Sequence, residues 1–422
     1  MGNPIYVIAY DVGTTGVKTC LFSITDKIEL LGAASEGYNL YVYPDGGAEQ
    51  DPDEWWEAMR TSTHTVMKKA KIKKSNISGI SFCSQMQALV LVDKEGNAVR
   101  RAMSYMDQRA REELKKGIAY GPQIAGANIP KLLKALKITG AVAASVKDPV
   151  WKYKWVEAHE PDAFNRAYKW LDVKEYLIGR MTGEFVMTQD SAFASMLYDI
   201  HKKCWSEEMC KIYGINPKHL AKIVKCTDKV GELSKKAADE LELEPGDASL
   251  IGVGAGSVDL GDTHVYSGTS GWVSTVVDKS VVDTSAMIAA IVGARDGYYN
   301  YFAELETAAK CVEWVKDHLA LDEIDIYLDK SKNLKHGKAD QEVIYTNLYD
   351  YMMAVVNTVP AGSNGVVFTP WLHGNRCPFE DPNSRGMFFN ISLETGKSEM
   401  IRAVVEGVCF HMRWLLETEA KK

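Results

Sequence analysis

Hydrophobic and polar positions alternate in the opening stretch of the chain, which reads YVIAYDVGTTGVKTCLFSI from Tyr6 to Ile24. A period of two predicts a pair of β-strands, and Gly13-Thr14-Thr15-Gly16 predicts the turn between them. The first strand ends with a carboxylate, Asp11. A plain hairpin needs the glycines but not this aspartate, which makes Asp11 a candidate functional residue.

The pattern then alternates between helices and strands. Asp51 can cap a helix that begins at Pro52. Two strands, Gly79–Cys83 and Ala88–Asp93, are predicted around the polar corner Ser84-Gln85-Met86-Gln87. From Asp107 to about Leu243 helices dominate. They are predicted at Arg109–Lys116, Lys131–Lys137, Trp151–His159, Asp162–Met181, Glu207–Tyr213 and Ser234–Leu243.

The opening pattern is repeated in the second half of the chain. HVYSGTSGWVSTVV, from His264 to Val277, is again a strand, a Gly-Thr-Ser-Gly turn and a strand. Helices are predicted after it at Leu305–Leu319, Glu342–Thr358 and Ser398–Glu419. A repeated hairpin indicates a duplicated architecture. We therefore predict an α/β protein of two related domains, residues 1–255 and 256–422.

Composition narrows the classes of function. A chain of 422 residues is too long for one ordinary core, and a net charge of −7 argues against a nucleic-acid-binding protein. The eight cysteines form no CxxC pair and have no zinc spacing to histidine. The sequence has no signal peptide and no apolar run of about 18 residues. A cytoplasmic protein without a membrane partner is expected, and a homodimer is one option for its assembly.

The two turns can bind phosphate. Glycines let the backbone approach closely, successive N–H groups form an anion-binding nest, and threonine hydroxyls add donors. Asp11 would then help to hold Mg²⁺ through water, with Lys18 either near the phosphate or in solvent. The alternative is a tight hairpin that Asp11 caps. A pair of matching hairpins favours a nucleotide, since phosphoryl transfer depends on positioning and charge neutralisation.

Six segments, in order, resemble motifs of the FGGY carbohydrate kinases, especially the xylulokinase-like branch of the actin-like ATPase superfamily. They are IAYDVGTTGVK, GAEQDPDEWW, ISGISFCSQMQALVLVD, SYMDQRA, DPVWKYKWVEAHEPDAF and RGMFFNISLETGKSEMIRAVVEGV. Tyr105 stands where the fourth motif has tryptophan. In the fifth, Lys152 and Trp155 fit, while Lys147 and Ala158 do not. Asn390 stands where the sixth usually has glycine.

The resemblance implies two actin-like (ribonuclease H-like) domains around a nucleotide and sugar cleft. It also implies ATP-dependent phosphorylation of a primary hydroxyl, of a ketopentose such as xylulose, with Mg²⁺. The implied ATP-phosphate residues are Gly13, Thr14, Thr15, Gly268, Thr269 and Ser270, and the implied metal residue is Asp11. The implied sugar-binding residues are Gln85, Met86, Gln87 and Asp107.

Structural roles stay open for three of the sugar-binding candidates. Gln85 and Asp107 could instead form a buried polar pair that closes a loop, and Met86 could be a core residue. Gln87 stands where xylulokinases often have histidine, which leaves the sugar open.

Two departures from the family concern catalysis. Relatives carry G-G-x-D, whose aspartate takes the proton from the sugar hydroxyl. Here about one helix of chain is absent between Val253 and Gly256, and Asp259 is the fallback candidate for the base, although VDLGD also reads as the turn before the His264 strand. A C-terminal GGGA segment that cradles adenosine is also not seen. Three interpretations are open: a kinase printed without some residues, a shortened kinase, or a degenerate member that binds sugar or a partner without catalysis.

Overall fold

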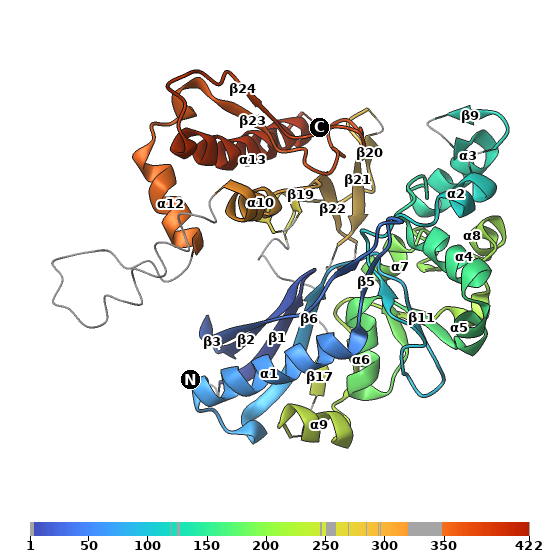
Figure 1. Ribbon diagram of the computed structural model, residues 1–422. Helices are drawn as coiled ribbons and strands as arrows, with labels where there is room; N and C mark the ends of the chain where they lie inside the picture. Colours follow the sequence, from blue (N-terminus) through green and yellow to red (C-terminus); the bar gives the residue numbers. More distant parts are fainter. Residues whose placement is uncertain are drawn as a thin grey trace. The chain divides into compact units, whose positions relative to one another are not determined.

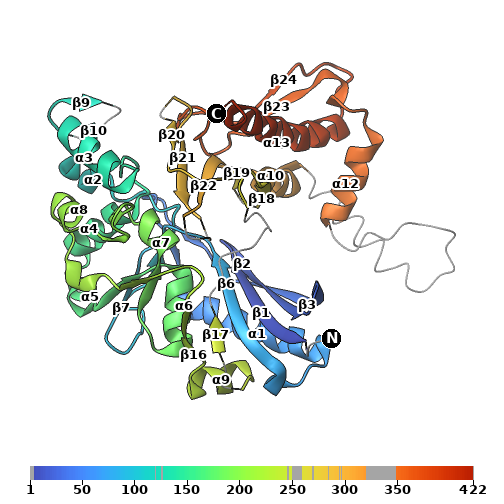
Figure 2. The ribbon, with the colours of Figure 1, turned by 180° about the vertical axis from the view of Figure 1, so that it is seen from behind.

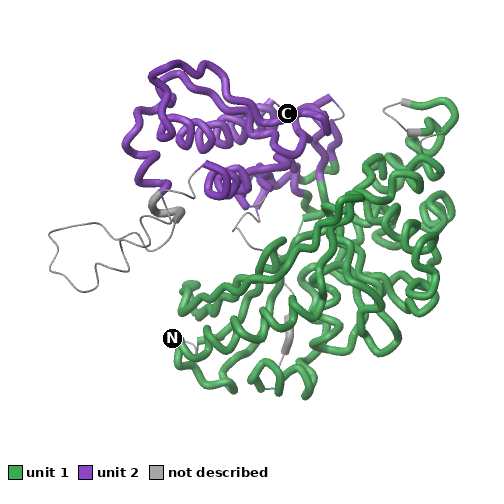
Figure 3. Tube along the Cα trace, in the orientation of Figure 1, with its two compact units in different colours: residues 1–258, 278–280, 291–299 green, residues 259–277, 281–290, 300–422 purple. Residues whose placement is uncertain are grey.

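The computed structural model describes residues 4–118, 120–124, 127–244, 247–249, 259–268, 270–283, 285–293, 295, 297–319 and 348–421. The chain divides into two compact units (Figure 3). Unit 1 contains residues 1–258, 278–280 and 291–299, and unit 2 contains residues 259–277, 281–290 and 300–422. The predicted boundary at residues 255 and 256 lies outside the described residues and stays a prediction. Among the described residues, no helix has both the length and the apolar character needed to cross a bilayer.

Unit 1 is built on a sheet with the strand order β3–β2–β1–β6 (Figure 1). The strands are β1 (Ile5–Val12), β2 (Gly16–Ile24), β3 (Ile28–Gly37) and β6 (Ile77–Ser84). β1 pairs antiparallel with β2 and parallel with β6, which confirms the hairpin predicted from the alternating pattern. The inward positions of β1, Ile8, Tyr10 and Val12, are buried, as a half-buried strand requires.

Helix α1 (Pro52–Ala70) covers this sheet by packing on β2 and β3. Asp51 caps it as predicted, because its Oδ1 accepts a hydrogen bond from Asp53 N at 3.0 Å. The helix buries Trp55, Met59 and Val66 against the sheet side of the core. Its outer face meets α9 (Lys235–Leu241), which also packs on α6 (Val173–Thr182) (Figure 2).

The helix predicted over Asp162–Met181 is wrong as a single element. The chain forms α5 (Pro161–Arg166), then the strand β11 (Lys169–Leu171), and only then α6. β11 pairs antiparallel with β7 (Val90–Val92), so that Trp170 lies opposite Leu91. This long-range pairing buries Trp170 and Leu171, and it overrides the local helix propensity.

The other predicted helices of unit 1 form within a few residues of their expected bounds. They are α2 (Arg111–Gly117), α3 (Ile129–Thr139), α4 (Pro149–His159) and α8 (Glu207–Tyr213). Together they enclose a second apolar core around Trp151 and Tyr153. The remaining elements are β4 (Tyr41–Val42), β5 (Ala48–Gln50), β8 (Ala102–Met103), β9 (Gln123–Ile124), β10 (Ala127–Asn128), β12 (Val186–Thr188), α7 (Gln189–Ala194), β13 (Tyr198–Asp199), β14 (Cys204–Trp205), β15 (Lys222–Val224), β16 (Lys229–Glu232) and β17 (Asp247–Ser249), with 3₁₀ turns at Lys74–Asn76 and Pro217–His219.

Unit 2 has its own sheet, with the order β18–β19–β22–β21–β20. Its strands are β18 (Thr263–Ser267), β19 (Gly271–Val277), β20 (Val282–Asp283), β21 (Ile288–Val292) and β22 (Tyr299–Leu305). The helices are α10 (Ala309–Leu319), α12 (Leu348–Thr358) and α13 (Lys397–Glu419), with β23 (Val367–Thr369), β24 (Met387–Phe389) and a 3₁₀ turn at Ser363–Gly365. α13 packs on β19, β23 and α10, so the second predicted hairpin also begins a sheet covered by helices.

Candidate active site

The turn between β1 and β2 is closed by its own backbone. Gly13 N donates to Gly16 O at 2.9 Å, and the antiparallel register pairs Val12 with Val17. A Cβ on Gly16 would lie 2.6 Å from the carbonyl oxygen of Glu36 on β3. Glycine at this position therefore lets β2 and β3 approach closely beside the turn.

Side chains from two other segments hold the carbonyl groups of this turn. The Gln50 amide on β5 donates from Nε2 to Thr14 O at 2.7 Å. The Tyr38 hydroxyl donates to Gly13 O. Thr14 is buried and Thr15 is exposed, so these contacts fix the base of the turn while its tip faces solvent.

Asp11 lies opposite Lys18 in the β1–β2 register. Its Oδ1 accepts a hydrogen bond from Cys83 Sγ on β6 at 3.3 Å. Burial raises the pKa of the Cys83 thiol to about 12, and the neighbouring Asp11 charge adds to the rise. The thiol is therefore a neutral donor at physiological pH, which leaves Asp11 as the carboxylate of this strand end. Lys18 is exposed.

The corner that follows β6 lies against the end of β1. Gln85 N donates to Val12 O at 2.8 Å, directly before the Gly13 turn. The Gln85 side chain donates from Nε2 to Gln50 Oε1 at 2.8 Å. Its Oε1 is buried and has no hydrogen-bond partner among the described residues. Met86 is half-buried, so it is not a fully buried core residue.

Gln87 occupies the left-handed region of backbone conformation, with φ at 63°. Two fully buried charged groups hold it there. Asp172 Oδ2 accepts from Gln87 N at 2.8 Å, and Lys152 Nζ on α4 donates to Gln87 O at 2.7 Å. Asp172 also caps α6, since its Oδ1 accepts from Val173 N at 2.8 Å. Left-handed backbone in a residue other than glycine is costly and persists only where the surroundings impose it.

Burial shifts both of these charged groups toward their neutral forms. It lowers the pKa of Lys152 to about 7, although Asp107, Asp148 and Asp172 oppose the shift. Burial also raises the pKa of the Asp172 carboxyl, while its backbone N–H donors oppose the rise. The corner is thus supported by polar groups that are sensitive to their partners.

Asp107 is fully buried and lies in an ion pair with Arg109, whose Nη2 is 2.6 Å from Asp107 Oδ2. Ala48 N on β5 donates to the same oxygen at 2.9 Å, and Arg109 N donates to Oδ1 at 3.1 Å. Arg109 also pairs with Glu49 at 2.5 Å. The structural role foreseen for Asp107, closing a loop, is therefore present.

The corresponding turn of unit 2 lies between β18 and β19. Gly268 N donates to Ser270 O at 2.8 Å, and Ala309 N at the start of α10 donates to Gly268 O at 2.7 Å. Thr269 lies outside the described residues. The ring of Tyr266 stacks on Trp272 with centroids 3.8 Å apart, which supports the strands on either side of the turn.

Asp259, the fallback candidate for the catalytic base, is exposed in unit 2. Its N–H donates to Asp262 Oδ2 at 2.9 Å, and Asp262 N donates to Asp259 O at 3.0 Å. The segment therefore forms a turn directly before β18, as VDLGD predicted. The stretch from Val253 to Gly256, where the family aspartate was expected, lies outside the described residues.

Two models of the FGGY family of carbohydrate kinases match the chain. The model of the N-terminal domain covers residues 6–255, and that of the C-terminal domain covers residues 264–422. The chain belongs to the FGGY family of carbohydrate kinases. Members of known structure have the actin-like fold, which confirms the predicted fold class.

Several FGGY kinases are similar over nearly the whole chain. A gluconokinase of Bacillus subtilis is 26% identical over 96% of this chain and 75% of its own length. A xylulose kinase of Staphylococcus xylosus is 25% identical over 96% of this chain and 78% of its own. The crystal structure of a ligand-bound xylulose kinase from Lactobacillus acidophilus matches with a TM-score of 0.72 at 25% identity, covering 96% of this chain and 76% of that one.

Sequence reasoning missed several residues that organise this FGGY site. Gln50, Asp172 and Arg109 were not selected, and Lys152 was noted only as a motif match. Gln50 lies within the AEQDP motif and Arg109 within SYMDQRA, so a motif position with a buried polar side chain was the available signal. Their partners are distant in sequence, which is why only the fold reveals the contacts.

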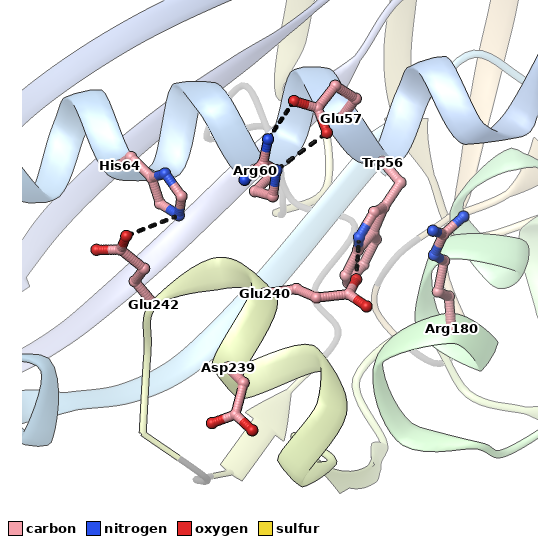
Figure 4. Close-up of a pocket in the computed structure, with 8 residues that line it drawn as sticks. All are labelled: Trp56, Glu57, Arg60, His64, Arg180, Asp239, Glu240 and Glu242. Atoms are coloured by element: carbon pink, nitrogen blue, oxygen red, sulfur yellow. Dashed lines mark hydrogen bonds and ion pairs between the residues drawn. The ribbon is translucent and has the colours of Figure 1, made fainter.

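A pocket of about 360 Å³ lies elsewhere in unit 1, where α1, α6 and α9 meet (Figure 4). None of the candidate site residues lines it. The Trp56 indole donates to Glu240 at 2.6 Å, and the Arg180 guanidinium lies 4.8 Å from the centre of the Trp56 ring. These polar groups already have partners within the pocket, which fits a structural junction between three helices.

Proposed function

We propose that this FGGY kinase transfers the γ-phosphoryl group of ATP to a primary hydroxyl of a ketopentose, with xylulose as the first acceptor. One observation carries the proposal. The predicted acceptor corner and the predicted phosphate turn adjoin, because Gln85 N bonds to the carbonyl of Val12, the residue before Gly13. Donor and acceptor chemistry need such proximity for phosphoryl transfer.

In this proposal the turn at Gly13, Thr14 and Thr15 binds ATP phosphates, with Gly268, Thr269 and Ser270 as the counterpart from unit 2. Bound phosphate needs donors on a rigid support, and the base of the first turn is fixed by the Gln50 contact at Thr14. The support limits the reorganisation that would otherwise accompany transfer.

Asp11 suits a magnesium ion that keeps several of its waters. No group of three or more His, Cys, Asp or Glu side chains in the described parts of the chain could hold a metal unaided. A single carboxylate beside a phosphate turn fits Mg²⁺, which takes most ligands from water and phosphate oxygens. When bound, the ion would neutralise charge on the transferring group. Asp11 would orient its water ligands.

At the acceptor corner, Gln85 Oε1 is a buried acceptor without a partner in the described structure. A sugar hydroxyl would satisfy it, and Met86 and Gln87 would line the same corner. Asp107 would contribute from its ion pair with Arg109. Asp259 is the base to be tested, since removal of the hydroxyl proton requires a carboxylate.

A sugar acid is the second candidate acceptor. Relatives named gluconokinase are as similar to this chain as those named xylulose kinase, and Gln87 stands where xylulokinases often have histidine. Gluconate therefore belongs beside xylulose in the assay. We place the reaction in the cytoplasm, where ATP and free sugars meet.

The test is ADP release with Mg-ATP against D-xylulose, gluconate, pentitols and glycerol. We expect one acceptor to stimulate release well above the rate with water alone. The Asp259→Asn variant then tests the base, with Asp278→Asn as an exposed control. Binding of a sugar by calorimetry without stimulated ADP release would favour a catalytically degenerate sugar-binding protein and reject the kinase proposal.

A further inference from the structure

The short strand β5 touches the predicted phosphate and acceptor residues with three consecutive buried residues. Ala48 N bonds to Asp107, and Glu49 pairs with Arg109. Gln50 bonds to the phosphate turn and to the acceptor corner. Three residues in a row thus connect segments that are far apart in the sequence.

The Gln50 amide is fully buried and uses both of its ends. Thr14 O can only accept, so it requires the NH₂ end of Gln50, which donates at 2.7 Å. Gln50 Oε1 must then face Gln85, and it can only accept there. Gln85 meets it with Nε2 at 2.8 Å.

This order determines which end of the Gln85 amide remains open. With Nε2 committed to Gln50, Gln85 Oε1 is turned away, buried, and without a partner in the described structure. A buried acceptor of this kind is costly unless a donor satisfies it. The backbone of Thr14 therefore dictates, through Gln50, that Gln85 presents an acceptor to a donor such as a hydroxyl.

We propose that Gln50 is a positioning residue that couples the phosphate turn to the acceptor corner by holding the Gln85 amide with its Oε1 toward the substrate hydroxyl. This inference rests on the proposed function for the identity of the two ligands. A nucleotide that tightens the turn orders the Gln85 amide, and by linkage an acceptor raises the affinity for nucleotide by the same factor.

Two variants separate the halves of this relay. Gln50→Glu has the same shape and keeps an acceptor for Gln85 Nε2, but it places an acceptor against Thr14 O and breaks that half alone. Gln50→Met removes both hydrogen bonds. Gln189→Met is the matched control, because Gln189 is a buried glutamine on α7 outside the relay.

The first measurement is calorimetric binding of Mg-AMP-PNP with and without D-xylulose or gluconate. We expect the unmodified protein and Gln189→Met to bind the nucleotide about fivefold tighter or more with the acceptor present. In Gln50→Met this ratio should fall close to one. A ratio that is unchanged in Gln50→Met overturns the inference.

The second measurement needs no sugar and no turnover. Hydrogen–deuterium exchange of a peptide covering residues 84–89 is followed with Mg-AMP-PNP alone. We expect the nucleotide to slow exchange there in the unmodified protein and in Gln189→Met, but not in Gln50→Met, although that variant still binds nucleotide. If Gln50→Met does not fold by circular dichroism, Gln50→Glu takes its place.

The two measurements distinguish this inference from the proposed function. Nucleotide-dependent protection that requires Gln50, found in a protein whose ADP release no acceptor stimulates, supports the coupling and rejects the kinase proposal. Stimulated ADP release with no nucleotide-dependent protection at residues 84–89 rejects the coupling and leaves the kinase proposal standing.

Discussion

The ammonium group of Lys152 donates a hydrogen bond to the backbone carbonyl of Gln87 at 2.7 Å, from a fully buried position on α4. On the other side of the same peptide unit, Asp172 accepts from Gln87 N at 2.8 Å. A buried lysine and a buried aspartate thus hold a residue whose φ is 63°. The shape of the acceptor corner depends on both of them.

Replacing Lys152 with methionine should weaken acceptor binding. The side chain keeps its length but loses the hydrogen bond, so Gln87 is free to leave the left-handed region. We expect the KM for the acceptor to rise about tenfold, while the KM for ATP changes little, because one charged hydrogen bond contributes roughly that factor. Steady-state ADP release measures both values.

The control for Lys152 is Lys169→Met. Lys169 Nζ also donates to backbone carbonyls, of Lys218 at 2.8 Å and Leu220 at 2.9 Å, but not at the corner. If both methionine variants raise the KM for the acceptor equally, the loss is a general effect of removing a lysine, and the specific role of Lys152 is wrong.

Asp11→Asn should raise the concentration of Mg²⁺ needed for half-maximal ADP release by about tenfold or more, since groups that orient metal-bound water typically contribute such factors. The asparagine oxygen can still accept from Cys83 Sγ, so the strand end should stay folded. Asp26→Asn, an exposed change beyond the far end of β2, is the control. An unchanged Mg²⁺ requirement in Asp11→Asn would remove Asp11 from the metal site.

Gly16→Ala should destabilise unit 1. The added Cβ would lie 2.6 Å from Glu36 O, and a backbone atom cannot move aside as a flexible side chain does. We expect the free energy of unfolding to fall by about 1–3 kcal/mol, as for other overpacked sites. Urea denaturation measures this loss. Gly32→Ala, whose Cβ would meet nothing closer than 3.8 Å, should change stability far less.

Glu419 should make the stability of unit 2 depend on pH. Its Oε2 accepts from Thr275 Oγ1 at 2.8 Å, but its Oε1 is buried without a partner among the described residues. Burial raises its pKa from 4.5 to about 7. Between these values the folded chain binds more protons than the unfolded chain, so this contribution is present below pH 4.5 and is lost as the pH rises through about 7.

The measurement is the Tm between about pH 5 and pH 8. We expect Glu419→Gln to flatten the decline of Tm with rising pH relative to the unmodified protein. Glu417→Gln, on the exposed side of α13, should leave the slope unchanged. Parallel curves for the unmodified protein and Glu419→Gln would contradict the prediction.

Local patterns predicted the hairpins, α1 with its Asp51 cap, and most helices, because side-chain periodicity and capping are properties of neighbouring residues. They could not predict β11, since its pairing with β7 joins Trp170 to Leu91. Likewise, the motifs indicated Gln85 and Thr14 as candidates, but they did not indicate that Gln50 lies between them.

The sequence by itself determined the family and the residue types available at the turns and the corner, since these are encoded in short ordered motifs. Only the tertiary structure decided how those residues support one another. The Gln85 amide owes its orientation to Gln50 and Thr14, and Gln87 owes its backbone conformation to Lys152 and Asp172. A buried polar group must find its partner in space, and for these groups the partners are tens of residues away along the chain.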